Sequence, residues 1–293
     1  MNIAFVPIDN RPVCYTLPEQ IAKCSDLVKL YLPDRNLLGS LTKFADTNAI
    51  LNWLAKLENI DAYVISLDTV AYGGLISSRR SDDSFDEIKN RLSKLKKILK
   101  DKKVYAFSSI MRISNNNINE EEKIYWKDWG KKIFEYSYNF HKNGTTKTEV
   151  PQDILKDYLQ TRERNFEINK MYLECQKEGL FETLIFSKDD CAEFGLNVME
   201  ANEKELNACA NKLAEQLRTK GIRVLVDDTD ARAPDKMWKW IKRGVPLRVE
   251  IGAKEMSDNT LTVTRRDLGK SSKATVAAEH FINDAKSMLD KIQ

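Results

Sequence analysis

Four aspartates stand where a parallel sheet would gather them. Asp9 and Asp68 each follow a short apolar segment, and Asp189 and Asp190 follow a third. Ligand sites of parallel α/β sheets collect just beyond the carboxyl ends of the strands. Carboxylates that meet there act as general acid and base, or hold a divalent cation through oxygen ligands. The pattern predicts a carboxylate site, and it leaves the use of a metal open.

The same strand ends carry residues suited to a substrate. Six of them follow predicted strands: Arg11, Tyr72, Gly73, Gly74, Arg79 and Arg112. The arginines suit an anionic substrate group or the aspartates themselves, and paired glycines let backbone approach a ligand closely. The same residues also have a purely structural interpretation, without a substrate. An aspartate after a strand often caps the next helix or pairs with a neighbouring arginine, and tight turns use paired glycines.

Short runs of Val, Ile, Leu and aromatic residues mark the strands that would position this site. Five of them occur with helical stretches between: 2–8, 27–32, 62–67, 103–111 and 183–187. Such runs are typical of buried strands in a mainly parallel sheet. Residues 48–57 and 85–99 have apolar residues at helical spacing, the second with a strongly basic outer face. We expect a βαβ fold with a helical excursion between the fourth and fifth strands, in which a helix begins at Pro151.

The composition suits two globular domains with reduced cysteines. The chain has 293 residues, 42% of them hydrophobic, and no apolar run near the ~20 residues that cross a bilayer. No secretory signal precedes the first strand, so we expect a cytoplasmic protein. Five scattered cysteines and two histidines argue against a disulfide framework or a zinc site. From Leu206 onward, 17 Lys and Arg stand against 12 Asp and Glu, a surplus that suits a polyanionic partner.

The last ninety residues have a different order of elements. A helix over 203–220 is expected to end at Gly221, as a helix C-cap does. A strand over 222–226, a short helix over 237–242 and two strands over 246–251 and 261–265 should follow. The turn residues between those two strands predict a hairpin connection, and a closing helix is expected from Lys273.

Several motifs before residue 200 resemble one bacterial family. They read VPIDNRPVCYTLP, LPDRNLLGSLTKFAD, ISLDTVAYGGLISSR, IMRIS and FSKDDCAEFG, in that order. Together they resemble the DUF4127 family, whose function is unknown. The resemblance implies an α/β domain over residues 1–200. It ends near Glu205 while members of the family continue further, so we expect this domain to be truncated relative to them.

The C-terminal sequence resembles another family. It reads GIRVLVDDTDARAPDKMWKWIKRGVPLRVEIG, followed by TLTVTRRD. This is similar to the anticodon-binding domain of prolyl-tRNA synthetases, and more loosely to that of the glycine, histidine and threonine enzymes. The resemblance implies a smaller mixed-sheet α/β domain over residues 201–293. Because such domains begin with a strand and a helix, an alternative boundary lies near residue 180.

An anticodon reader needs stacking faces, base-edge partners and phosphate-binding cations. The resemblance implies these roles for eight residues: Asp228, Arg232, Lys236, Trp238, Arg248, Glu250, Arg265 and Arg266. Among them Lys236 and Glu250 are expected to meet the guanines of a proline anticodon, although the run before Met237 departs from the usual wording of that family. Two alternatives stay open. One of Trp238 and Trp240 is a core residue, or Arg248 and Glu250 simply form a cross-strand pair.

Two functions follow from these patterns. The first is a protein that binds tRNA, proline tRNA in particular, without aminoacylation, because neither the class II catalytic motifs nor a Walker-type phosphate loop occurs. The alternative is a hydrolase acting on a small-molecule substrate through the N-terminal aspartates. A third interpretation is a joined chain that keeps neither ancestral function. Neither domain predicts a membrane partner or a particular cofactor.

Overall fold

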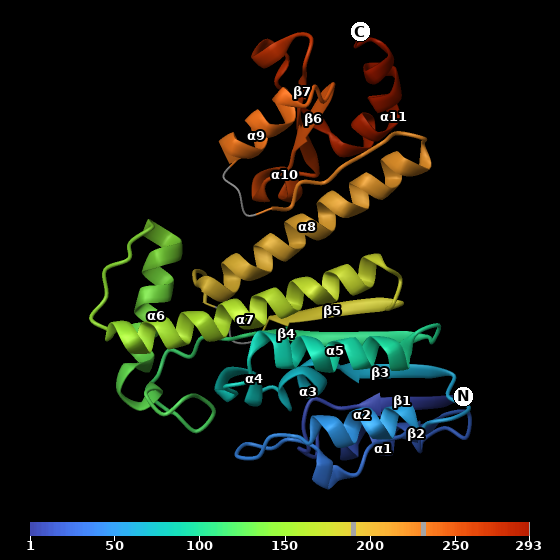
Figure 1. The fold of residues 1–293 in the computed structure, drawn as a ribbon, viewed down its shortest axis with the longest axis vertical. Helices are drawn as coiled ribbons and strands as arrows, with labels where there is room; N and C mark the ends of the chain where they lie inside the picture. The colour runs from blue at the N-terminus through green and yellow to red at the C-terminus, as the bar shows by residue number, and fades with distance from the viewer. Residues whose placement is uncertain (189–191, 230–232, 293) are drawn as a thin grey trace. The chain divides into compact units, whose positions relative to one another are not determined.

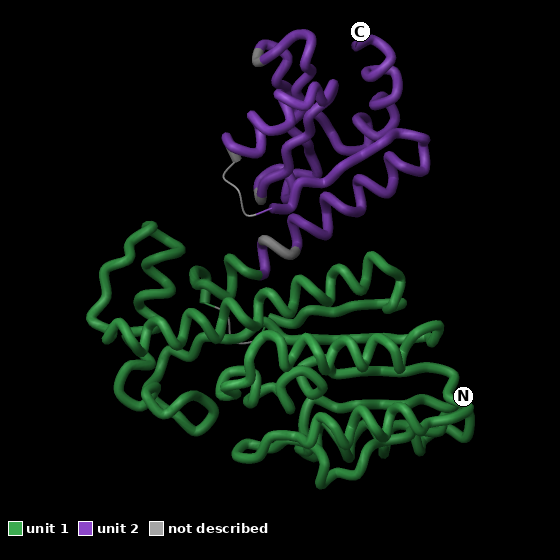
Figure 2. Tube along the Cα trace, viewed as in Figure 1, with its two compact units in different colours: residues 1–200 green, residues 201–293 purple. Residues whose placement is uncertain are grey.

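The computed structural model describes residues 1–188, 192–229 and 233–292. The chain divides into two compact units, residues 1–200 and 201–293 (Figure 2). Each unit has its own hydrophobic core. No helix of the described ranges is both long and apolar enough to span a bilayer.

The first unit is built on five parallel strands, as the sequence predicts (Figure 1). They are β1 (Asn2–Val6), β2 (Lys29–Tyr31), β3 (Ala62–Ser66), β4 (Val104–Ile110) and β5 (Thr183–Lys188). The order in the sheet is β2-β1-β3-β4-β5. The chain therefore leaves β1 in one direction and returns past it to β3. Such a reversal opens a crevice at the carboxyl ends of the two strands, where ligands of open α/β sheets bind.

Helices lie on both faces of this sheet. The helical elements of the first unit are α1 (Thr16–Ala22), η1 (Arg35–Leu37), α2 (Thr47–Ala55), α3 (Leu67–Tyr72), α4 (Ser77–Arg80), α5 (Phe85–Leu99), α6 (Trp126–Asn143) and α7 (Gln152–Lys177). Side chains of α2, α3, α5 and α7 pack with Ala4, Val6, Ile65 and Ala106 in one core, whereas α1 lies on the opposite face, beside Ile3, Phe5 and Val64. Helix α6 and the start of α7 form a separate cluster around Trp126, which is the predicted excursion between β4 and β5.

Helix α5 shows how local sequence sets an element. Ser84 and Glu87 form a reciprocal capping box at its start, which satisfies two backbone N–H groups that have no partner within the helix. Its buried residues, Ile88, Leu92, Leu95 and Leu99, recur every three or four positions. That spacing puts them on one side of the helix, against the sheet. The observed bounds are those predicted from the sequence.

Gly73 ends α3 in a left-handed conformation, with a φ of 88°. A Cβ atom added there would lie 3.0 Å from the backbone nitrogen of Ala45, whereas one added at Gly144, which ends α6 with a φ of 67°, would meet nothing within 4 Å. We expect Gly73→Ala to lower the free energy of unfolding by about 2–4 kcal/mol, through both backbone strain and crowding. Gly144→Ala should cost only the strain, about 1 kcal/mol. Urea denaturation of both variants measures the difference, and equal losses would contradict the crowding.

The second unit combines a small antiparallel sheet with helices. Its elements are α8 (Leu196–Thr219, which begins in the first unit), α9 (Ala233–Lys242), β6 (Leu247–Glu250), α10 (Ala253–Ser257), β7 (Thr260–Arg265), η2 (Gly269–Ser272), β8 (Ala274–Ala277) and α11 (Ala278–Asp290). The strand order is β6-β7-β8, with antiparallel pairs throughout. Leu213 and Leu217 of α8 pack with Leu261, Val263 and Phe281. The α/β fold class predicted from the sequence is confirmed.

Four details of this unit differ from the sequence-based expectation. Residues 222–226 form no strand; they run as a coil from the end of α8 (Figure 1). Ile222 and Val224 pack on the core while Leu225 is 66% exposed, so the alternation is strand-like, but no ladder with β6 forms. The sheet is consequently antiparallel where a mixed one is expected. The connection between β6 and β7 contains α10, and β8 precedes the closing helix.

Candidate functional site

Asp68 is a buried carboxylate at the carboxyl end of β3. It is 1% exposed. Its two oxygens accept hydrogen bonds from the Ser108 hydroxyl at 3.0 Å and from the backbone N–H of Ser109 at 2.8 Å, both on β4. The Ser108 hydroxyl also lies 3.2 Å from the side-chain oxygen of Asn169 on α7. The carboxylate thus joins β3 to the neighbouring strand.

Asp9 follows β1 and is also buried, but its partner is local. The guanidinium of Arg11 donates to it at 2.7 and 2.8 Å, and the backbone N–H of Arg11 at 3.0 Å. Burial, together with the Asp9 carboxylate, raises the pKa of the Cys14 thiol to about 11. Cys14 is therefore protonated near neutral pH. The contact between Asp9 and Arg11 is the neighbouring pair that the structural interpretation predicts.

Arg79 and Arg112 bind carboxylates that the sequence pattern does not predict as their partners. The Arg79 guanidinium lies 2.6 Å from Glu122, and the two side chains are 2% and 4% exposed. Glu121 pairs with Arg112 and lies 3.7 Å from Arg79. The hydroxyl of Ser114 also donates to Glu122, at 3.4 Å. The signal for these partners was the run of three glutamates in the polar segment after β4, some forty residues from Arg79.

The two glycines after α3 contact backbone atoms of other segments of this unit. A Cβ at Gly74 would lie 3.2 Å from the carbonyl oxygen of Ile8, and Gly73 accepts a hydrogen bond from the N–H of Ala45 at 2.9 Å. Burial raises the pKa of Tyr72 well above its ordinary value. These residues bring the loop after β1 and the helix after β3 together. They lie at the carboxyl ends of β1 and β3, where the strand order reverses.

Of the four predicted catalytic aspartates, Asp189 and Asp190 lie outside the described residues. Across the described part of the chain, no group of three or more His, Cys, Asp and Glu is placed to hold a metal ion. Asp9 and Asp68 are engaged with Arg11 and with two β4 serines. Both described aspartates at this edge of the sheet therefore have partners, a cation for Asp9 and neutral donors for Asp68.

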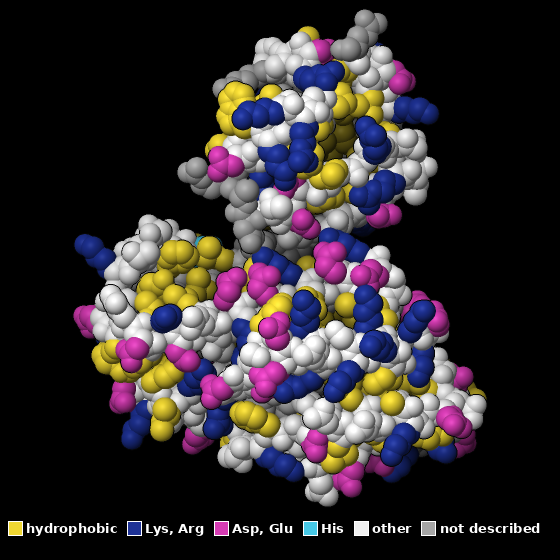
Figure 3. All heavy atoms as spheres, viewed as in Figure 1, with side chains coloured by type: hydrophobic (Ala, Val, Ile, Leu, Met, Phe, Trp, Pro, Cys, Tyr) yellow, Lys and Arg dark blue, Asp and Glu magenta, His cyan; other side chains and the backbone are white. Residues whose placement is uncertain are grey.

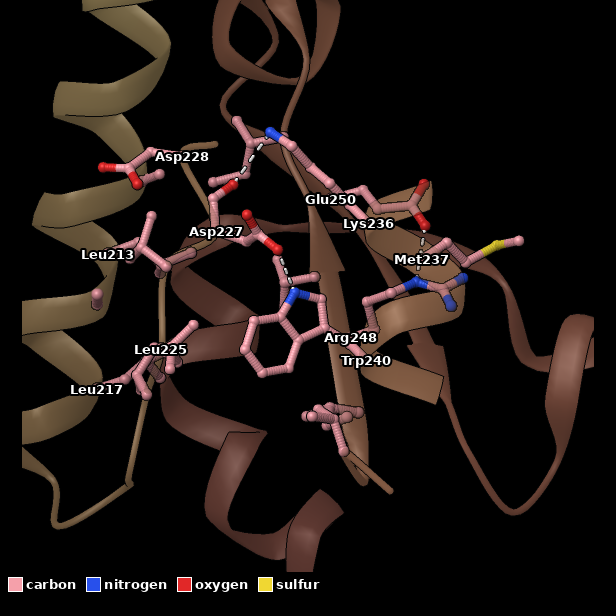
Figure 4. A pocket seen from close by; sticks show the side chains of 18 of the residues that line it. Leu213, Leu217, Leu225, Asp227, Asp228, Lys236, Met237, Trp240, Arg248 and Glu250 are labelled. Atoms are coloured by element: carbon pink, nitrogen blue, oxygen red, sulfur yellow. Dashed lines mark hydrogen bonds and ion pairs between the residues drawn. The ribbon is translucent and has the colours of Figure 1, made fainter. Parts of the chain in front are cut away.

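The second unit has an open hollow of about 1500 Å³. Figure 4 shows it from close by. Apolar side chains from α8, from the coil 222–226 and from β6 form much of its wall, among them Leu213, Leu217, Val224 and Val249. Polar residues enter it from the end of that coil, from α9 and from β6. An apolar hollow with a few convergent polar groups is the usual form of a binding site.

Asp227 organises the polar side of this hollow. It accepts hydrogen bonds from the Thr229 hydroxyl at 2.6 Å, from the indole N–H of Trp240, and from the Lys239 ammonium at 3.1 Å. The ammonium of Lys236 donates to its backbone carbonyl at 3.3 Å (Figure 4). The bonds from Thr229, Trp240 and Lys239 hold the pKa of Asp227 well below its usual range. The carboxylate therefore stays charged near neutral pH and fixes Trp240 and Lys239.

Three further charged side chains, Arg248, Glu250 and Lys273, lie with Asp227 at the hollow. Arg248 donates to Glu250 at 2.9 Å within β6, and Lys273 lies 3.1 Å from the other oxygen of Glu250. Lys236, Arg248, Glu250 and Lys273 all line the hollow. Arg248 and Glu250 thus form the pair proposed as a structural alternative, although along one strand. The pair leaves both side chains at the hollow, on the same side of β6 (Figure 4).

The two tryptophans of α9 differ in exposure, and neither belongs to the hydrophobic core of the unit. Trp240 is half-buried against Asp227, and the Arg243 guanidinium lies 5.0 Å from its ring centroid. Trp238 is 55% exposed. One tryptophan is therefore held within the unit and the other offers a free aromatic face.

Arg265 and Arg266 do not line the hollow, whereas Asp228 does. Arg265 pairs with Asp267 at 2.6 Å, and Arg266 donates to the carbonyl of Gly244. Asp228 is exposed, and its side chain points away from the Asp227 carboxylate (Figure 4). Arg232 lies outside the described residues. In Figure 3, Lys and Arg side chains surround the hollow of the second unit, which suits an anionic ligand.

Comparison with known proteins identifies a domain in the C-terminal part of the chain. A family model described as "Anticodon binding domain" matches residues 195–288. A proline–tRNA ligase of Protochlamydia amoebophila is 34% identical over 96 residues, which are 31% of this chain and 19% of the ligase. One of Thermococcus kodakarensis is 37% identical over 91 residues, 31% of this chain and 18% of the ligase. The chain thus spans about a fifth of the length of these relatives, and it contains an anticodon-binding domain like theirs.

Among solved structures, the Giardia lamblia prolyl-tRNA synthetase in complex with prolyl-adenylate is similar over 31% of this chain and 20% of that one. The identity is 28% and the TM-score 0.30. A second family model, for proteins of unknown function (DUF4127), matches residues 3–222. That match runs past Glu205 and shares residues 195–222 with the anticodon-binding model. Because it covers most of the chain, the protein belongs to the DUF4127 family.

Proposed function

We propose that this protein binds tRNA, proline tRNA in particular, through the hollow of its second unit, and that it does so in the cytoplasm without aminoacylation. One observation carries the proposal. In a domain similar to that of proline–tRNA ligases, cationic donors and a carboxylate acceptor stand at one hollow beside a fixed tryptophan. Recognition of unstacked bases needs such a combination of stacking faces and edge partners.

The proposed contacts divide by chemistry. Lys236, Arg248 and the carboxylate of Glu250 match the acceptor and donor edges of guanine. Trp238 supplies a stacking face, while Arg265, Arg266 and Arg232 are proposed to meet phosphates. Asp228, exposed beside Asp227, completes the proposed surface. Aminoacylation is not proposed, because the sequence lacks the class II catalytic motifs.

Binding of tRNA by the intact chain tests the proposal. We expect a micromolar or tighter Kd for a proline tRNA, rising about 10-fold to 100-fold when the anticodon guanines are replaced. The affinity should fall steeply with salt, because binding releases counterions from the phosphates. Filter binding over a salt series measures both effects. Equal affinity for the two tRNAs would reduce the site to a basic surface and contradict anticodon recognition.

The hydrolase alternative finds less support. The oxygens of Asp9 and Asp68 accept hydrogen bonds from Arg11, Ser108 and Ser109. A general base must lie within hydrogen-bond reach of the proton that it takes, and the contacts of these two carboxylates are with Arg11 and with β4. These contacts give both carboxylates a structural role in the fold. We therefore do not propose a hydrolase activity or a small-molecule substrate.

A further inference from the structure

A surface of the first unit has a strong charge pattern that the proposed function does not use. Residues 88–100 contain no acidic residue, and six of the thirteen are Lys or Arg. Two of the six are engaged: Arg91 pairs with Asp83 at 2.7 Å, and Lys96 pairs with Glu178. The other four are exposed and have no ion pair with any described residue. These four, Lys89, Lys94, Lys97 and Lys100, are called the basic stripe.

Helix geometry puts the basic stripe on one surface. With about 100° between successive residues, the four lysines fall within about 140° of the helix circumference. That arc lies opposite the buried side chains of α5, which include Leu92, Leu95 and Leu99. Lys94, Lys97 and Lys100 follow one another at intervals of three residues, about 4.5 Å along the axis. In Figure 3, Lys and Arg side chains lie over the region of α5.

The fold alone does not explain this arrangement. Like charges three residues apart repel and destabilise a helix. The helix dipole favours cations in the last turn, which accounts for Lys97 and for Lys100 at the C-cap, but not for Lys89 and Lys94. The stripe is bounded by Asp86 and Glu87 in the first turn and by Asp101 after the C-cap. Between these bounds no acidic residue stands against the four lysines, and such a row is complementary to a polyanion.

The chemistry of the surface selects among polyanions. An interfacial membrane helix needs exposed apolar side chains to enter the lipid, and those of α5 are committed to the core. Protein interfaces are built around buried aromatic and arginine anchors, and they are depleted of lysine. A nucleic-acid backbone needs only a row of cations spaced along its charges.

We propose that the basic stripe binds the phosphate backbone of RNA, as a second contact surface in addition to the hollow of the second unit. The choice of RNA over other polyanions rests on the proposed tRNA-binding function. The contact is independent of sequence, because lysines that meet phosphates position a nucleic acid without reading its bases. It should therefore add affinity and salt dependence, but no anticodon selectivity.

The test is tRNA binding by full-length Lys94→Gln/Lys97→Gln/Lys100→Gln protein. We expect the Kd at low salt to rise about 10-fold for the cognate and the anticodon-substituted tRNA alike, and the slope of log K against log salt to fall by about 2 to 3. The control replaces three exposed lysines elsewhere in the unit, Lys56, Lys127 and Lys131, by Gln, so that the net charge is the same. A lysine-to-arginine triple variant should bind like the parent, and thermal melts verify folding.

The outcomes separate this inference from the proposed function. If the parent distinguishes anticodons and the stripe variant binds with unchanged affinity and slope, the stripe proposal fails and the tRNA function stands. If the parent binds every RNA alike and only the stripe variant loses binding, the stripe is supported and anticodon recognition fails. Equal losses in the stripe and control variants would mean a net-charge effect and overturn the proposal. So would stripe-dependent binding to phosphatidylserine vesicles with unchanged RNA affinity, which would assign the surface to membranes.

Discussion

Replacing Glu122 by alanine is expected to destabilise the first unit by about 3–5 kcal/mol. The variant leaves the Arg79 guanidinium, 2% exposed, without its closest carboxylate at 2.6 Å. Removing one partner of a buried ion pair strands the other charge in a medium that solvates it poorly, and the cost far exceeds that of an exposed pair. Urea denaturation followed by far-UV circular dichroism measures the loss as a shift of the midpoint for the first unit.

A matched control uses an exposed pair of the same unit. Lys23 and Glu19 lie 2.8 Å apart with side chains 71% and 37% exposed, so Glu19→Ala should cost less than about 1 kcal/mol. Glu121 lies 3.7 Å from Arg79 and is the remaining carboxylate near it. If Glu122→Ala loses no more stability than Glu19→Ala, Glu121 replaces Glu122 as the partner of Arg79. The ion pair between Arg79 and Glu122 would then not be required for the stability of the unit.

The elements that follow from local sequence were predictable. The five strands of the first unit and α5 depend on apolar spacing and on the Ser84 capping box, which act over a few residues. The coil over 222–226 was predicted as a strand because its residues alternate in the same way. A strand also needs a partner at its edge, and no property of Ile222 or Val224 states whether β6 will supply one. Non-local pairing is the part that the pattern leaves undetermined.

In the candidate sites too, local contacts were predictable from the sequence and non-local contacts were not. The contact between Asp9 and Arg11 spans two residues, and the structural interpretation of a strand-end aspartate anticipated it. The partner of Arg79 is 43 residues away on a polar segment without helical or strand periodicity, so its identity could not be read from the spacing. In the second unit the resemblance marked the surface around Glu250. It pointed to Asp228, while Asp227 makes the contacts that order the hollow.

Asp227→Ala is expected to weaken tRNA binding by the intact chain at least about 10-fold and to reduce its preference among anticodons. The carboxylate holds the indole of Trp240 and the ammonium of Lys239, and both lose their acceptor in the variant. A freed lysine and tryptophan must be ordered again on binding, and each immobilised side chain costs about 0.5–1.5 kcal/mol. Because the pKa of Asp227 lies below its usual range, the parent should show no loss of binding through Asp227 titration between about pH 5 and 8.

Asp284→Ala is the matched control, since it removes an exposed aspartate of the same unit and changes the net charge equally. Removing a negative charge by itself strengthens attraction to a polyanion, so simple electrostatics predicts tighter binding for both variants. The positioning role of Asp227 instead predicts weaker binding for Asp227→Ala. Weaker, less selective binding by Asp227→Ala together with unchanged or tighter binding by Asp284→Ala therefore assigns the effect to the ordered hollow. If both variants bind more tightly, the contacts of Asp227 serve only the fold of the unit.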